Sequence, residues 1–145
     1  MAITQAICNT FKEELLQGDH NFDSGGDVFK LALYTSDATL DSSTTIYTSS
    51  DEVGDSGQYV AGGGTLVNSG TSVVGGVAFC DFADLSFTGV TLTARGALIY
   101  NTSATVANAA VAVLDFSSDK TATDGTFTIV FPADTSAAAI LRISG

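Results

Sequence analysis

The sequence Thr-Phe-Thr-Ile-Val-Phe at residues 126–131 sets an apolar side chain at every second position, with Phe127, Ile129 and Phe131 on one face. A period of two is the pattern of a β-strand that buries one face and leaves the other wet. Residues 110–114 are apolar throughout, which predicts a strand covered on both faces.

Short segments rich in Val, Ile, Phe, Tyr and Thr recur after residue 27, separated by clusters of Gly, Asp and Ser. β-Branched and aromatic residues favour strands, whereas Gly and Asp favour turns. The chain therefore predicts a mainly β fold, a two-sheet sandwich or jelly roll of about eight strands, with a small barrel as the other arrangement. The predicted strands cover residues 28–35, 44–48, 58–61, 73–82, 86–93, 95–101, 109–116, 126–131 and 138–143.

One helix precedes the strands. Ile3, Ile7, Phe11 and Leu15 recur every four residues and Gly18 follows, which predicts an amphipathic helix over residues 3–17. Its apolar stripe is imperfect, because Glu14 falls at one edge of it, so we expect the helix to pack on a partly wet surface. The length fits a single domain over residues 1–145, with the sandwich over 28–145.

The glycine clusters mark turns. Residues 51–76 combine acidic side chains with Gly62–Gly64 and a further pair at Gly75 and Gly76, so we expect exposed loops there. Gly62–Gly64 is not followed by the Gly-Lys-Ser/Thr of a phosphate-binding loop, which favours an ordinary turn. Pro132 is expected to end the strand over 126–131.

The charge balance limits the partners. The chain has 5 basic and 16 acidic residues, a formal net charge of −11, so a surface that neutralises nucleic-acid phosphates or anionic lipids is not expected. No apolar run approaches the roughly 20 residues of a membrane-spanning helix. The first residues lack a secretory signal pattern, so we expect synthesis in a cytoplasm.

The residue pattern nominates no catalytic, cofactor-binding or metal-binding site. His20 is the only histidine and has no nucleophile motif beside it, so we expect an ordinary loop residue. Asp19, Asp23 and Asp27 do not have the spacing of a calcium-binding EF-hand loop, and an acidic loop is usually solvated. Cys8 and Cys80 lack metal or disulfide spacing, which predicts buried reduced thiols.

Arg95 interrupts an apolar region, and an arginine beside buried strands needs a carboxylate partner. Asp81 and Asp84 are the candidate partners. A structural ion pair is the favoured interpretation, with a substrate-binding arginine as the other.

Seven segments, taken in order, carry a resemblance to a known family. The most specific are TARGALIYN at residues 93–101 and AVAVLDFSSDK at 110–120. With them stand ITQAICNTFKEELL (3–16), KLALYTSDATL (30–40), DFAD (81–84), FTIVFP (127–132) and AILRI (139–143). Together they resemble short virion structural proteins of tailed bacteriophages. Departures lie mainly in residues 51–77 and at Phe87, where many members carry Trp.

The resemblance implies a non-enzymatic component of the virus particle, and within that class a capsid cement or decoration protein. Such proteins are small β-sandwich or jelly-roll oligomers that bind the outer capsid surface and stabilise the shell. The implied partners are the major capsid protein and further copies of the chain, as a dimer or trimer. No nucleic-acid or membrane partner is implied. The hypothetical contact residues are Phe11, Leu15 and Leu16, for which packing on the protomer's own sandwich is the other interpretation.

Two alternatives stay open. The first is a tail, connector or fibre-associated virion protein, including one that contacts a host receptor. The second is a host-targeting enzyme or lectin, which the residues favour less, because the sequence has no Trp and no paired catalytic groups stand out.

Overall fold

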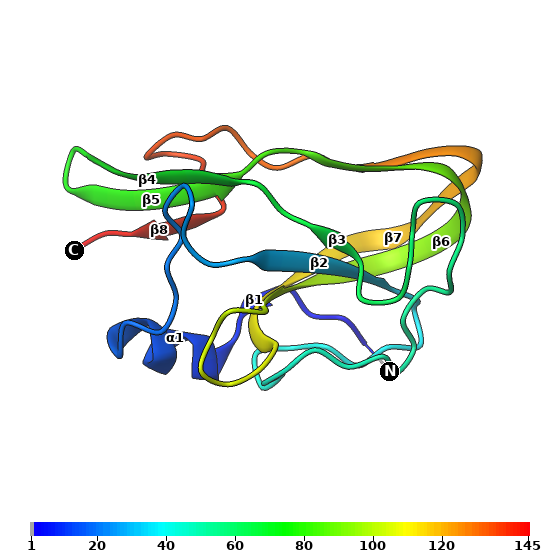
Figure 1. Cartoon of the computed structure of the whole chain (residues 1–145), viewed down its shortest axis with the longest axis horizontal. Helices are drawn as coiled ribbons and strands as arrows, with labels where there is room; N and C mark the ends of the chain where they lie inside the picture. Colours follow the sequence, from blue (N-terminus) through cyan, green and yellow to red (C-terminus); the bar gives the residue numbers. More distant parts are fainter. Residues whose placement is uncertain (1) are drawn as a thin grey trace.

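The computed structural model describes residues 2–145 and has two antiparallel sheets and one short helix (Figure 1). The larger sheet has the strand order β1-β7-β6-β2-β3, and the smaller has the order β4-β5-β8. The mainly β, two-sheet fold class is thus confirmed. The elements are β1 (Ala6–Ile7), α1 (Asn9–Leu16), β2 (Phe29–Tyr34), β3 (Gly64–Thr65), β4 (Asn68–Val74), β5 (Val77–Phe82), β6 (Leu85–Asn101), β7 (Ala109–Ile129) and β8 (Leu141–Ile143).

Strands β6 and β7 form one long hairpin that bends at the end of the molecule away from β4 and β5 (Figure 1). Its register shifts at several points, one of them between Ala94 and Gly96. A Cβ atom at Gly96 would lie 2.5 Å from the carbonyl oxygen of Leu114, so the close approach requires glycine. The sequence predicts breaks at 94 and over 117–125, but pairing continues through both, because bulges interrupt the alternation without ending the strand.

Several other predicted strands also differ from the structure. Residues 44–48 form a loop with one isolated bridge from Ile46, and residues 58–61 form a turn. The strand predicted over 73–82 is a hairpin, because Gly75 and Gly76 both have positive φ and reverse the chain. Strand β3 and most of β4 lie between the predicted strands over 58–61 and 73–82, where exposed loops are expected. The last strand is limited to Leu141–Ile143.

The helix is shorter than predicted and is not the first element. Residues 6 and 7 pair with Val113 and Ala112 of β7, and Ile3 bridges Leu40, so the N-terminal residues are extended. Their apolar side chains continue the helical spacing, but the backbone instead pairs with the edge of a sheet. Helix α1 begins at Asn9 and ends before Gly18, which has a φ of 75°.

The core lies between the two layers and beneath α1. It includes fully buried Tyr34, Tyr59 and Leu98, and a group of stacked and tilted rings from Phe22, Phe29 and Phe82. The segment over residues 110–113 is buried on both faces, as its uninterrupted apolar sequence predicts. Cys8 and Cys80 are free and buried, also as predicted.

Candidate functional site

The three predicted contact residues of α1 differ in their surroundings. Phe11 is buried, with its ring centroid 4.8 Å from that of His20 and 5.8 Å from that of Phe22. Leu15 is partly buried, whereas Leu16 is 91% exposed. Phe11 therefore packs within its own protomer. This agrees with the second interpretation of the residue, packing on the protomer's own sandwich, and not with a partner contact. Of the three, only Leu16 is largely exposed to solvent.

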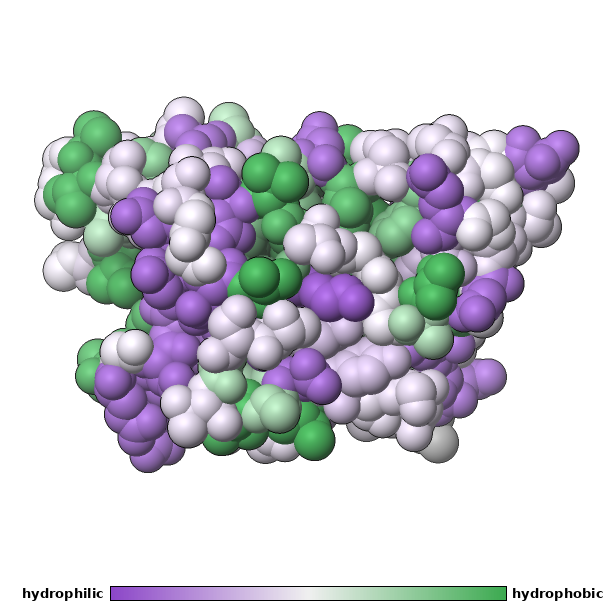
Figure 2. Space-filling model, viewed as in Figure 1, coloured by the Kyte–Doolittle hydropathy of each residue, from purple (hydrophilic) through white to green (hydrophobic). Residues whose placement is uncertain are grey.

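Beside Phe11 lies an open groove of about 760 Å³ between α1 and the face of the smaller sheet, which we call the notch. Figure 2 shows the indentation between the two lobes at the left of the molecule. Only two charged side chains line it, Lys12 and Arg142, and both are basic. Its apolar lining comes mainly from Ile7, Phe11, Leu15, Phe22, Leu141 and Ile143.

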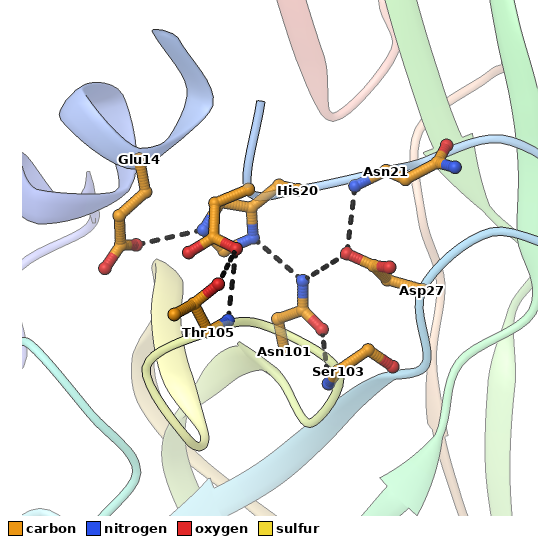
Figure 3. Close-up of polar contacts among 8 residues, drawn as sticks. Glu14, His20, Asn21, Asp27, Asn101, Ser103 and Thr105 are labelled. Atoms are coloured by element: carbon orange, nitrogen blue, oxygen red, sulfur yellow. Dashed lines mark hydrogen bonds and ion pairs between the residues drawn. The ribbon is translucent and has the colours of Figure 1, made fainter. Parts of the chain in front are cut away.

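A buried polar network holds α1 against the sandwich (Figure 3). His20 Nε2 lies 2.9 Å from Glu14 Oε1, and His20 Nδ1 lies 2.9 Å from Asn101 Nδ2. Asn101 Nδ2 also donates to Asp27 Oδ2 at 2.8 Å. The helix, the loop after it and the end of β6 are thus joined through one imidazole.

The network fixes the tautomer of His20. The backbone N–H of Ser103 donates to Asn101 Oδ1, so the amide of Asn101 must present its N–H groups to Asp27 and His20. His20 Nδ1 is therefore the acceptor, and Nε2 carries the hydrogen that is donated to Glu14. The side chain of His20 has no solvent exposure, and each of its two ring nitrogens lies within hydrogen-bond distance of a protein side chain.

The sequence does not predict this network, because its members come from three distant segments. His20 is expected to be an ordinary loop residue, yet it is buried and stacks near Phe22 and Phe29. One signal was present: Glu14 stands at the edge of an apolar stripe, and a carboxylate in that position needs a polar partner once buried.

The predicted ion pair of Arg95 with Asp81 or Asp84 is wrong. Arg95 Nε lies 2.9 Å from Asp119 Oδ1, and the two side chains are 36% and 49% exposed. The register of the β6–β7 hairpin explains why Asp119 is the partner, because Ala94 pairs with Lys120 and brings Arg95 beside Asp119. Such an exposed pair contributes little to stability.

Asp81 and Asp84 instead bind the backbone. The N–H of Phe82 donates to Asp81 Oδ1 at 2.8 Å, and the N–H of Phe131 donates to Asp84 Oδ1 at 2.9 Å. Asp81 is 1% exposed, and its Oδ2 has no hydrogen-bond partner among residues 2–145. Burial, helped by the negative charge of Asp134, raises the pKa of Asp81 above its ordinary value.

At the end of the sandwich opposite the notch, Glu52 anchors the long loop between β2 and β3 through hydrogen bonds. The hydroxyls of Tyr47 and Tyr59 and the backbone N–H of Gly62 all donate to its carboxylate. The hydroxyl of Tyr100 donates to the carbonyl oxygen of Gly62. These bonds seal the loop over the core, and the sequence did not identify them because Glu52 lies in an apparently solvated acidic run.

Within residues 2–145, no three His, Cys, Asp or Glu side chains are grouped so that they could hold a metal ion. Asp19 accepts two hydrogen bonds from Thr105, which lower the pKa of its carboxyl. Burial raises the pKa of the Cys8 thiol to about 11 and that of Cys80 to about 12, so both stay protonated at neutral pH.

No helix within the described part of the chain has the length and apolar character needed to cross a membrane. Comparison with protein-family models, curated proteins and solved structures finds no match to this chain.

Proposed function

We propose that this chain is a non-enzymatic structural protein of a tailed-bacteriophage virion, and specifically a capsid cement or decoration protein. The observation that carries the proposal is the joint presence of TARGALIYN and AVAVLDFSSDK. The two segments lie on β6 and β7 and pair with each other, with Ala97 opposite Leu114 and Leu98 opposite Val113. The resemblance therefore concerns one contiguous unit at the centre of the larger sheet.

The character of the surface supports a protein partner. On the exposed face of the β6–β7 hairpin, hydroxyl groups of Ser86 and Thr128 lie 2.9 Å apart, as do those of Thr93 and Thr121. An uncharged hydroxyl surface costs less to desolvate than a charged one, so it suits packing against another protein. The net charge of −11 opposes binding to nucleic acid.

The enclosed state of His20 supports a non-enzymatic role. Both of its ring nitrogens are held by protein atoms, and its side chain is inaccessible to solvent. The two thiols are buried and have raised pKa values. The side chains best suited to general-base or nucleophilic chemistry are thus engaged in packing.

In this role the chain, made in the cytoplasm of the bacterial host, binds the outer capsid surface and contacts more than one copy of the major capsid protein. A stable contact buries about 800 Å² on each partner. A subunit that bridges neighbouring capsid proteins gains avidity, because the second contact forms at a high effective concentration. The shell then resists expansion more strongly with the chain than without it.

The test is addition of the purified chain to phage particles that lack it. We expect the chain to co-sediment with heads and to raise the temperature at which they release DNA. A matched control uses tails separated from heads. Binding to tails alone, with no change in head stability, would contradict the cement role and favour the tail alternative.

A further inference from the structure

At one end of the sandwich, an apolar hairpin projects beside the notch. Strands β4 and β5 extend past α1 at the left of Figure 1 and meet at the turn formed by Gly75 and Gly76. Val73 is 69% exposed and Val74 is 55% exposed at this tip. Outer edges of β4 and β8 have no neighbouring strand in the described structure. The hairpin thus carries apolar side chains and unpaired strand edges into solvent.

The register shows which face of the hairpin adjoins the notch. Val73 lies opposite Ala78, and Ala78 lies opposite Ile143, so the three share one face of the smaller sheet. Ala78 and Ile143 line the notch. Val73 therefore extends the apolar face of the notch towards the tip, beyond the cover of α1. Ile143 is itself 60% exposed, so this face is unpartnered in the protomer.

The charge distribution makes this end different from the rest of the surface. No charged residue lies between Asp55 and Asp81, a stretch that contains the whole β4–β5 turn. No Asp or Glu side chain lines the notch, although the chain has 16 of them. The two charged lining residues, Lys12 and Arg142, are basic, and neither has an ion pair in residues 2–145. A strongly acidic partner is attracted here and repelled elsewhere.

We propose that the notch is an interface between two copies of this chain, in which the β4–β5 hairpin of each copy docks in the notch of the other. Such a contact is isologous, because the same surface serves both partners about a two-fold axis. Each copy supplies both complementary parts, an uncharged apolar projection and an apolar recess, at the same end of the molecule. The partner's tip, Val73 to Val77, brings only valine side chains and glycine backbone to the recess.

A second copy is favoured by charge. Two chains of net charge −11 repel each other, and the lining of the notch adds no acidic side chain to that repulsion. The pairing also covers the exposed Val73 and Ile143, which one protomer leaves in water. The inference does not depend on the proposed function, since it concerns the purified chain alone.

The experiment is sedimentation velocity of the full chain over a concentration series, with three single variants. We expect a concentration-dependent dimer for the unchanged chain. Val73→Lys and Ile143→Lys each add a positive charge to an apolar contact whose two charged lining residues, Lys12 and Arg142, are already basic, and should weaken dimerisation roughly tenfold or more. Val130→Lys is the matched control, because Val130 is 72% exposed, as Val73 is 69%, yet does not line the notch.

Each outcome bears on the proposal. A circular-dichroism melt shows whether the variants stay folded, which we expect because all three positions are exposed. A chain that sediments as a monomer at every concentration overturns the proposal. So does an oligomer that Val73→Lys and Ile143→Lys leave intact, or one that Val130→Lys disrupts equally. Failure of capsid binding with an intact notch-dependent dimer would contradict only the proposed function.

Discussion

The two ends of the sandwich cover their apolar side chains by different means. At one end, Tyr47, Tyr59 and Gly62 converge on Glu52 and hold a long loop over the core. At the other, the notch and the β4–β5 hairpin leave Val73 and Ile143 in solvent. We call these the closed end and the open end. The difference indicates that the closed end serves folding, whereas the open end is available for binding.

The substitution with the largest expected effect on stability tests which part of α1 belongs to the core. Phe11→Asp places a charge in the core and should lower the free energy of unfolding by roughly 4 kcal/mol or more. Leu16→Asp, five residues along the same helix, should change it by no more than about 0.5 kcal/mol. Urea denaturation measures both. Equal destabilisation by the two variants would mean that Leu16 belongs to the core.

The closed end should respond next most strongly. Glu52→Ala removes the acceptor for two phenols and one backbone N–H, so we expect a loss of about 3 kcal/mol. Tyr47→Phe removes one of these bonds and is the graded control, with an expected loss of about 1 kcal/mol. If Glu52→Ala melts like the unchanged chain, the loop is not what seals this end.

The His20 network holds the helix that forms one wall of the open end. His20→Phe keeps an aromatic ring but leaves the carboxylate of Glu14 and the amide of Asn101 without this partner, so we expect a loss of about 2 kcal/mol. Adding Glu14→Leu should restore part of the loss, because the unpaired carboxylate is then absent. Strictly additive losses in the double variant would argue against the coupling.

Asp81 lies in β5, within the sheet of the open end, and should make stability depend on pH. Because its pKa is raised, the folded chain binds this proton more tightly than the unfolded chain. The ionised carboxylate then destabilises the fold at every pH above the raised value, and this effect disappears as the pH falls towards the ordinary value of Asp. Asp81→Asn should raise the melting temperature by about 2–4 °C at pH 7 and remove this slope. A lower melting temperature at pH 7 with an unchanged slope would show that the charge is not the destabilising feature.

The smallest effect is expected where β6 and β7 bend. Arg95→Met removes an exposed pair with Asp119 and should cost no more than about 1 kcal/mol. Thermal melts at low and high salt measure it, and the difference from the unchanged chain should shrink as salt screens the pair. A loss of several kcal/mol would mean that Arg95 is more deeply engaged than its 36% exposure indicates.

The sequence predicts the parts of the fold that depend on local periodicity. The alternation at Phe127 and Ile129 and the apolar run over 110–113 identify strands in the correct places. The bend near Gly96 is not predictable in this way, because a bulge changes the spacing while pairing continues. Ile3 and Ile7 fit a helical stripe, but Ile7 pairs with the edge strand β7 and Ile3 bridges Leu40 instead.

The sites depended on contacts between distant segments and were harder to predict. Asp119 as the partner of Arg95 follows only from the register of β6 with β7, which the sequence does not specify. The network of Glu14, His20 and Asn101 spans three segments of the chain, so no local sequence pattern contains it. The notch likewise exists only once α1 lies beneath the smaller sheet.

Cryo-electron microscopy of the virion tests the central claim most directly. The account predicts density for this chain on the outer capsid surface at the junctions between capsid subunits. Density confined to the tail or to the portal vertex would contradict the cement role and assign the chain to the tail.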